Sequence, residues 1–239
     1  TRSVGMNALL ILLLGAAARA LAAAPGQLVT QGPATAKRIA LTFDDGPGPQ
    51  TEKFLEMLAR HRVRATFFLS GELVALKPET VRRTLARGHE IGSHTFNHTN
   101  YKAHQRDLLG AQKGPNAEAA AQARAKSDLL KDLRATHAAI EKCSGAKVNL
   151  CRMPHGIDRP WIRDAAREMG YTLVNWTYGA DWNKGTAQEL LPGYLTAIRP
   201  GAILLFHDGG KERSKSLAMA EAVIQSARQR GFEIVTVGE

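Results

Sequence analysis

The stretch KRIALTFDDGP, residues 37–47, joins an apolar run to two adjacent acids and a turn. The run over 37–43 predicts a buried strand, and Gly46-Pro47 predicts the turn that ends it. Asp44 and Asp45 stand where the strand stops. Neighbouring ionised carboxylates repel each other unless a cation lies between them or their surroundings separate their pKa values. The pair is therefore either a polar turn or part of a charged site.

Apolar runs of strand length recur along the chain. Between them lie helical stretches, such as the one in which Phe54, Leu55 and Leu58 share a face. Alternating strands and helices with continuous apolar strands predict an α/β fold with a parallel sheet. With seven such units, a distorted (β/α) barrel of about seven parallel strands is favoured over an open sheet. The other six predicted strands are VRATFFL (63–69), GHEIG (88–92), AKVNLC (146–151), YTLVNW (171–176), GAILLF (201–206) and FEIVTV (232–237).

The stretch from Tyr101 to about Ala125 is polar and Ala-rich, and Gly114-Pro115 interrupts it. We expect a surface loop here that runs into a long helix. Nothing in its composition indicates chemistry.

The N-terminal region has an apolar run over Ala8–Ala18, followed by small residues that offer A-x-A-like cleavage sites. This run is too short to cross a bilayer comfortably, so it indicates a secretory signal, with an uncleaved N-terminal anchor as the alternative. A secreted or periplasmic location in the cell envelope follows. The 239 residues, 44% of them hydrophobic, suit one domain of ordinary size. Three parts are predicted: a signal peptide over 1–24, a linker over 25–36 and one folded domain over 37–239.

The formal net charge is +10, and it remains +8 without Arg2 and Arg19 of the predicted signal peptide. A basic protein favours an anionic polymer or membrane surface. The sequence has no basic helix or aromatic-interleaved basic patch of the kind that binds nucleic acid, so we expect no nucleic-acid partner. We also expect a monomer with no membrane span in the mature form. Cys143 and Cys151 are close enough to form a disulfide worth about 2 to 3 kcal/mol in an oxidising compartment.

Polar residues follow five of the predicted strands. The carboxyl ends of parallel strands meet at one face, where α/β barrels and open sheets place their active sites. We therefore expect these segments to converge on one site. They are Asp44-Asp45, the run from Ser93 to His98, the run from Arg152 to Gly156, Asp181-Trp182 and His207-Asp208.

His94 and His98 stand four residues apart, a spacing that puts two imidazoles on one face of a helical turn. Together with a carboxylate from a neighbouring strand end they would form a His-His-Asp metal site with an open position, which is typical of catalytic sites. His155 lies in a segment assigned to the site, and its role stays open. Four other histidines have surroundings that indicate a structural role: His61, His89, His104 and His137.

These segments resemble the polysaccharide deacetylases, that is, carbohydrate esterase family 4 with its chitooligosaccharide deacetylase homology domain. The matching motifs are TFDDGP, SHTFNH, RMPHG, ADW and LLFHD, and they occur in the family's order within residues 37–239. The resemblance implies a distorted barrel with a metal site. Two histidines and one carboxylate favour Zn²⁺ there, with Co²⁺ and other divalent transition metals as alternatives. The resemblance makes residues 37–239 the catalytic domain.

The resemblance also implies a role for each matching residue. Asp44 would be the catalytic base, and Arg152 would orient it through a charge-assisted hydrogen bond. Asp45 would complete the set of metal ligands with His94 and His98. His207 would be the general acid, and Asp181 would raise its pKa. The backbone N–H of His155, beside Pro154, would be the oxyanion donor. Leu205 and Trp182 would form walls of the acetyl pocket.

Three positions depart from the family's motifs. Met153 and His155 replace two residues of an R-P-P-Y-G-like segment, and Tyr178 stands where the first aspartate of D-x-x-D-W would be. Because these positions flank the substrate, the departures affect the expected shape of the sugar-binding groove.

The implied activity is hydrolytic removal of N-acetyl groups from amino-sugar polymers. An envelope location and a basic charge favour the N-acetylglucosamine of peptidoglycan over chitin oligomers or poly-N-acetylglucosamine. An O-acetyl glycan esterase is the alternative with the same metal. A non-catalytic wall-binding protein is the rival from another class, and the presence of every role-bearing residue disfavours it.

Overall fold

The computed structural model describes residues 23–239. All but the last two residues of the predicted signal peptide, 1–24, lie outside the described part. Within 23–239, no helix has both the length and the apolar character needed to cross a membrane.

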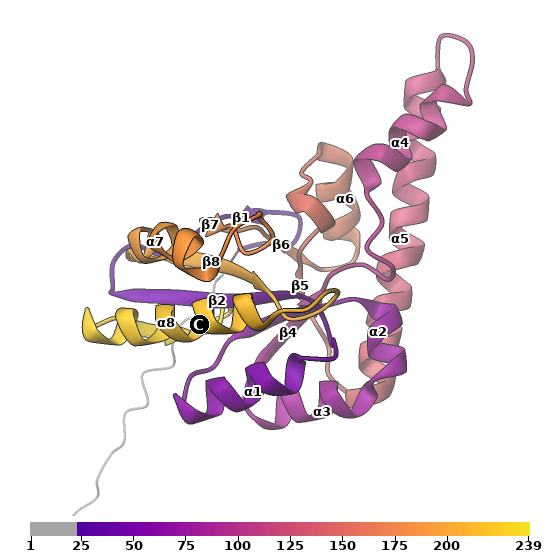
Figure 1. Ribbon diagram of the computed structural model, residues 1–239. Helices are drawn as coiled ribbons and strands as arrows, with labels where there is room; N and C mark the ends of the chain where they lie inside the picture. Colours follow the sequence, from indigo (N-terminus) through magenta and orange to yellow (C-terminus); the bar gives the residue numbers. More distant parts are fainter. Residues whose placement is uncertain (1–22) are drawn as a thin grey trace, which may run out of the picture.

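Residues 23–239 form one sheet of nine strands, and every strand pair in it is parallel. The sheet order is β1-β6-β5-β4-β3-β2-β8-β7, and β9 pairs with the first residues of β2. The curled sheet is an incomplete barrel with β1 and β7 as its edges, which confirms the predicted fold class (Figure 1). The strands are β1 (Leu28–Val29), β2 (Arg38–Gly46), β3 (Thr66–Leu69), β4 (Glu90–Ser93), β5 (Leu150–Cys151), β6 (Thr172–Val174), β7 (Tyr178–Gly179), β8 (Ala202–His207) and β9 (Glu233–Val235).

The helices connect these strands and cover the outer face of the sheet (Figure 1). Two of them begin with a proline in the first turn, where the missing N–H is not needed. They are α1 (Thr51–Arg60), α2 (Gly71–Leu76), α3 (Pro78–Ala86), α4 (Tyr101–Gly110), α5 (Ala117–Ser144), α6 (Pro160–Glu168), α7 (Ala187–Ala197) and α8 (Ser214–Gln229), with a short 3₁₀ turn η1 (Pro154–Gly156).

Side chains of β2 alternate between two separate apolar clusters, because successive residues of a strand point to opposite faces. Ile39, Leu41 and Phe43 belong to the large core between sheet and helices. Ala40 belongs to a smaller cluster with Phe68, Leu150, Val174, Ile203 and Val237. Asp44 is four residues after Ala40 and therefore points to the same face of the strand, into the interior of the barrel.

Several local predictions were wrong. Residues 25–36, expected to be a linker, contain β1, which pairs with β6. The predicted strand over 146–151 is reduced to Leu150–Cys151. The stretch from Tyr101 to Ala125 begins with a helix rather than a loop: the Asn100 side chain accepts a hydrogen bond from the Ala103 N–H and caps α4. Together, α4 and the first part of α5 project from the body as a helical arm, and the rest of α5 packs beside α2 (Figure 1).

The possible disulfide is absent from the structure, in which Cys143 and Cys151 are free thiols. Cys151 lies in β5 and is fully buried, and burial raises the pKa of its thiol to about 12. Cys143 lies in the last turn of α5, where its thiol donates to the Ile140 carbonyl.

Tyr194 of α7 joins the elements around the carboxyl ends of β7 and β8. Its buried hydroxyl donates to the Leu205 carbonyl at 2.7 Å. The same oxygen accepts from the N–H groups of Ala180 and Asp181, at 2.9 and 3.1 Å. The Tyr194 ring stacks on Phe206 with 4.3 Å between centroids.

We predict that Tyr194→Phe lowers the free energy of unfolding by about 1–3 kcal/mol, because it leaves two buried N–H groups without an acceptor. Urea unfolding followed by circular dichroism would measure the loss. Tyr178→Phe is the matched control, since Tyr178 packs edge-on against Tyr194 and its hydroxyl does not serve these amides. Equal losses in the two variants would contradict the role given to the Tyr194 hydroxyl.

Candidate active site

Asp45, His94 and His98 bring three potential metal ligands together. Their ligating atoms all lie within 4.8 Å of one another. Oδ1 of Asp45 is 3.4 Å from Nε2 of His94 and 3.3 Å from Nε2 of His98. This oxygen is buried and has no hydrogen-bond partner among the described residues. An unpaired buried carboxylate oxygen that faces two imidazole nitrogens fits a divalent cation, so these residues can hold one.

The ligand-bearing segments have unusual backbone conformations. Asp45, Thr95, His98 and His155 all lie in the left-handed region, with φ of 69°, 64°, 58° and 60°. Residues other than glycine rarely adopt this conformation, and when they do they are concentrated at functional sites. Gly209 contributes by lacking a side chain, since a Cβ there would lie 1.8 Å from the Asp45 carbonyl oxygen.

The protonation states also suit a metal. Nδ1 of His94 lies 2.7 Å from the Arg152 carbonyl, so it donates there and leaves Nε2 free for a ligand bond. Burial and the neighbouring His94 lower the pKa of His98, which favours the neutral imidazole that binds metals. Burial alone would raise the pKa of Asp45, but the surrounding imidazoles outweigh it and lower that pKa to about 2.

Asp44 forms a buried ion pair with Arg152. Nη1 of Arg152 donates to Oδ1 of Asp44 at 2.7 Å, and the two residues are 0% and 2% exposed. Arg152 also donates to the carbonyls of Val174 and Asn175, at 3.0 and 3.1 Å. Oδ2 of Asp44 remains free of Arg152 and lies 3.8 Å from Nε2 of His94. One oxygen is thus held and the other faces the ligand cluster.

His207 and Asp181 form a second pair at the end of β8. Nδ1 of His207 is 2.8 Å from Oδ1 of Asp181, and the His207 N–H donates to Oδ2 at 2.8 Å. Burial lowers the pKa of His207, but Asp181 and the charges of Asp44 and Asp45 raise it above its usual value. In the sheet, His207 is the register partner of Asp44, which places base and acid candidates beside each other.

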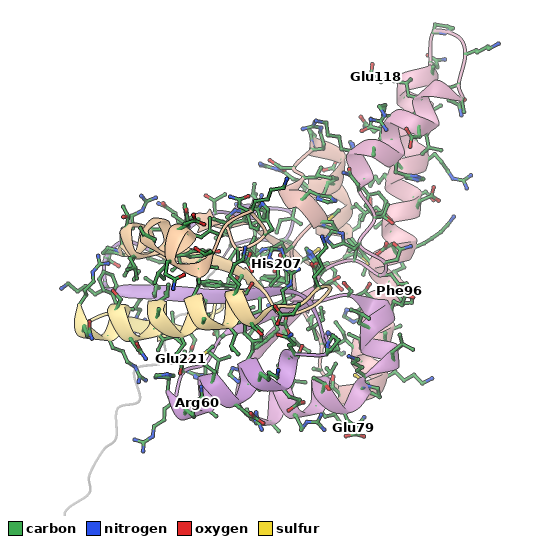
Figure 2. The ribbon with its side chains drawn as sticks, viewed as in Figure 1. Arg60, Glu79, Phe96, Glu118, His207 and Glu221 are labelled. Carbon is green, nitrogen blue, oxygen red and sulfur yellow. The ribbon has the colours of Figure 1, made fainter. Side chains whose placement is uncertain are left out.

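The remaining predicted residues surround this pair. Trp182 is 48% exposed and its ring packs edge-on against His207, at 5.4 Å between centroids. Leu205 and Trp182 lie side by side, since a Cβ on Gly179 would approach both within 3.1 Å. The exposed His155 ring packs edge-on against His98 at 5.0 Å, and Pro154 is buried. Figure 2 labels His207 at the end of β8 and Phe96 in the loop that carries His98.

The four histidines expected to be structural have partners outside the ligand cluster. His61 contacts Glu221, and His104 contacts Asp128. His137 contacts the Tyr171 hydroxyl, and His89 accepts from the Ala65 N–H.

Three residues at the site were not assigned a role from the sequence. Ser216 of α8 donates to Oδ2 of Asp181 at 2.6 Å. Nη2 of Arg213 lies 3.6 Å from Oδ2 of Asp45. Asp208 is fully buried and bonded to the Thr51 hydroxyl, and burial raises its pKa to about 7. Asp208 was within reach of sequence analysis because it directly follows His207, but the other two depend on how α8 packs.

The sequence is similar to those of known proteins. A family model described as polysaccharide deacetylase matches residues 31–174. A chitooligosaccharide deacetylase of a Bradyrhizobium species is 34% identical over 83% of this chain and 88% of its own. A peptidoglycan-N-acetylglucosamine deacetylase of Bacillus cereus is 30% identical over 90% of this chain and 92% of its own.

Among solved structures, the peptidoglycan deacetylase PdaC from Bacillus subtilis superposes with a TM-score of 0.68 and 29% identity. The match covers 86% of this chain and 90% of PdaC. The fold, the motifs and these relatives agree, and the chain belongs to the polysaccharide deacetylase family.

Proposed function

We propose that the protein is a metal-dependent hydrolase that removes N-acetyl groups from amino-sugar polymers, with the N-acetylglucosamine of peptidoglycan as its substrate. One observation carries this proposal: the Asp45, His94 and His98 cluster lies beside a buried carboxylate, Asp44, and a paired histidine, His207. The set holds a candidate base, a candidate acid and a metal site within one barrel mouth.

Asp45, His94 and His98 would hold the metal. Two imidazoles and one carboxylate with open positions suit Zn²⁺, and Co²⁺ and other divalent transition metals accept the same ligands. The bound cation supplies Lewis acidity toward the acetyl carbonyl and the attacking water.

The residues around the metal would divide the proton transfers. Oδ2 of Asp44 takes a proton from the water that attacks the acetyl carbon, while Arg152 holds Oδ1. Nε2 of His207 gives a proton to the leaving nitrogen, since Nδ1 is bonded to Asp181. The C–N bond then breaks, and the products are acetate and a free amine. The His155 N–H would stabilise the oxyanion.

The His207–Asp181 pair distinguishes an N-deacetylase from the alternative functions. Amines leave poorly unless they are protonated, and the raised pKa of His207 keeps an acid available. An ester oxygen needs less help, so the intact pair favours an amide over an O-acetyl ester. A non-catalytic wall-binding protein would not need the buried base, the acid and the ligands to be retained together.

Peptidoglycan is supported by the Bacillus cereus relative and by the net charge of +8 for the part after residue 24. A basic protein is concentrated at an anionic wall. Peptidoglycan lies outside the cytoplasmic membrane, so the proposal includes a secreted or periplasmic location. The Bradyrhizobium relative makes chitin oligomers the second candidate substrate.

We predict that Asp44→Asn and Asp45→Asn fail in different ways. Asp44→Asn should still bind zinc but lose about 10²- to 10⁴-fold in kcat, the usual contribution of a general base. Asp45→Asn should weaken zinc binding first. Zinc titration of the metal-free protein, followed by acetate release at saturating zinc, would measure both. An Asp44→Asn enzyme that stays fully active with zinc supplied would contradict the base assignment.

A second prediction concerns pH. The protonated form of His207 is the active one, so kcat should fall as pH rises through the pKa of His207. Asp181 raises that pKa, and Asp181→Asn should therefore move the alkaline fall in kcat to lower pH. The His104–Asp128 pair provides the control, because Asp128→Asn alters a similar contact outside the ligand cluster. If kcat of Asp181→Asn falls at the same alkaline pH as kcat of the wild type, the assignment of His207 as the acid is contradicted.

A third prediction concerns the substrate. Acetate release should be faster from peptidoglycan fragments than from chitin oligomers of equal length at low salt. Added salt should slow attack on intact wall more than attack on short neutral oligomers, because screening weakens the attraction to the wall and leaves the metal site unchanged. Turnover of chitin oligomers together with no turnover of wall material would contradict the peptidoglycan assignment. The assignment as a deacetylase would still stand.

A further inference from the structure

The loop between the two histidine ligands depends on its neighbours for its shape. Thr95 and His98 both have left-handed backbones, and neither is a glycine. The first two amides of α2 hold the loop from one side, since the N–H groups of Gly71 and Glu72 donate to the carbonyls of Thr95 and Phe96, each at 3.0 Å.

A carboxylate from α5 also holds the loop. Oδ1 of Asp132 accepts from the Phe96 N–H at 2.5 Å. Oδ2 of Asp132 accepts from the Tyr101 hydroxyl at 3.1 Å, and Tyr101 lies buried three residues after His98. A single side chain thus bonds to the middle of the loop and to the residue that starts the next helix.

The packing around the loop leaves little freedom for another arrangement. A Cβ on Gly71 would lie 2.6 Å from the Phe96 ring and 2.8 Å from the Thr136 hydroxyl, so α2, the loop and α5 are in close contact. Thr136 is one helical turn after Asp132 and is itself buried. The loop is therefore held between two helices, and Asp132 supplies the only side-chain acceptor in the described structure that bonds to a loop N–H from Thr95 to His98.

We propose that Asp132 is a positioning residue for the metal centre, because it fixes the loop that presents Nε2 of His98 beside Nε2 of His94. This inference rests on the metal site of the proposed function. The hydrogen bonds of Asp132 go to the Phe96 N–H and the Tyr101 hydroxyl, so it would act through the backbone of the loop.

His98 depends on this support more than His94 does. The His94 N–H donates to the Leu69 carbonyl of β3, and its ring is fixed by the Arg152 carbonyl. The His98 side chain is 37% exposed and follows the loop. Loss of the Asp132 bonds should therefore displace or loosen His98 and leave His94 in place.

The test is the zinc dissociation constant of the metal-free protein, measured by competition with a chromophoric chelator. Asp132→Ala should raise it about 10- to 100-fold, the usual effect of losing a partner that orients a ligand. Asp132→Leu fills the same space without an acceptor and should behave alike, which keeps the test valid if the alanine variant does not fold. Asp132→Asn keeps one acceptor oxygen for the Phe96 N–H, and its affinity should lie between wild type and Asp132→Ala.

Two comparisons separate this role from general support of α5. Asp128→Ala is the control on the same helix, since Asp128 contacts His104, Arg124 and Lys131, and it should bind zinc like wild type. In a His98→Ala background, Asp132→Ala should cause no further loss of zinc affinity, because both changes act on the same ligand. Urea unfolding of the metal-free variants confirms that each is folded.

Wild-type zinc affinity in both Asp132→Ala and Asp132→Leu would overturn the inference while the proposed function stands. An equal loss in Asp128→Ala, or a full second loss in the His98→Ala background, would also overturn it. A wild-type protein that binds no zinc would overturn the metal site itself, and with it both proposals.

Discussion

The parallel register between β2 and β8 is the constraint on which the site depends. Along β2, Leu41 and Phe43 point to the helices, and Thr42 and Asp44 point into the barrel. The register pairs Asp44 with His207. The alignment of β2 with β8 that buries the apolar side chains therefore also places two titratable groups side by side. A slip of one residue would send Asp44 into the helix layer. The demands of the core and of the site are therefore met by one pairing.

Arg152 adds an electrostatic constraint to this geometric one. Its guanidinium is fully buried and stacks on Phe68, 4.2 Å from the ring centroid. A buried charge is tolerated only when it is paired and its donors are satisfied. Arg152 meets both needs through Asp44, Thr42 and two carbonyls. The carbonyl of the same residue orients His94, so one side chain and its backbone connect the candidate base to the metal ligands.

The sequence was sufficient for features whose signal is local or repeated. Continuous apolar runs predicted the long strands, and polar residues at their ends predicted the convergence of Asp45, His94 and His98 that the structure shows. The two-residue strands β1 and β7 carry no such signal, because their existence depends on neighbours already in place. The contacts of Ser216 and Asp132 depend on the packing of two long helices, and residue spacing in the sequence does not predict that packing. The roles of the site residues remain predictions.

The sheet order also bears on how the chain folds. Strand β2 needs partners from the far end of the sequence: the Thr42 hydroxyl donates to the Leu204 carbonyl, 162 positions away. Contacts of such long range are formed only after a large loss of chain entropy, so folding is expected to be slow compared with proteins built from local contacts. Until β8 arrives, one edge of β2 stays unpaired and can associate with other chains. Asp44 and His207 meet in the same late step, so the barrel and its reactive pair are completed together.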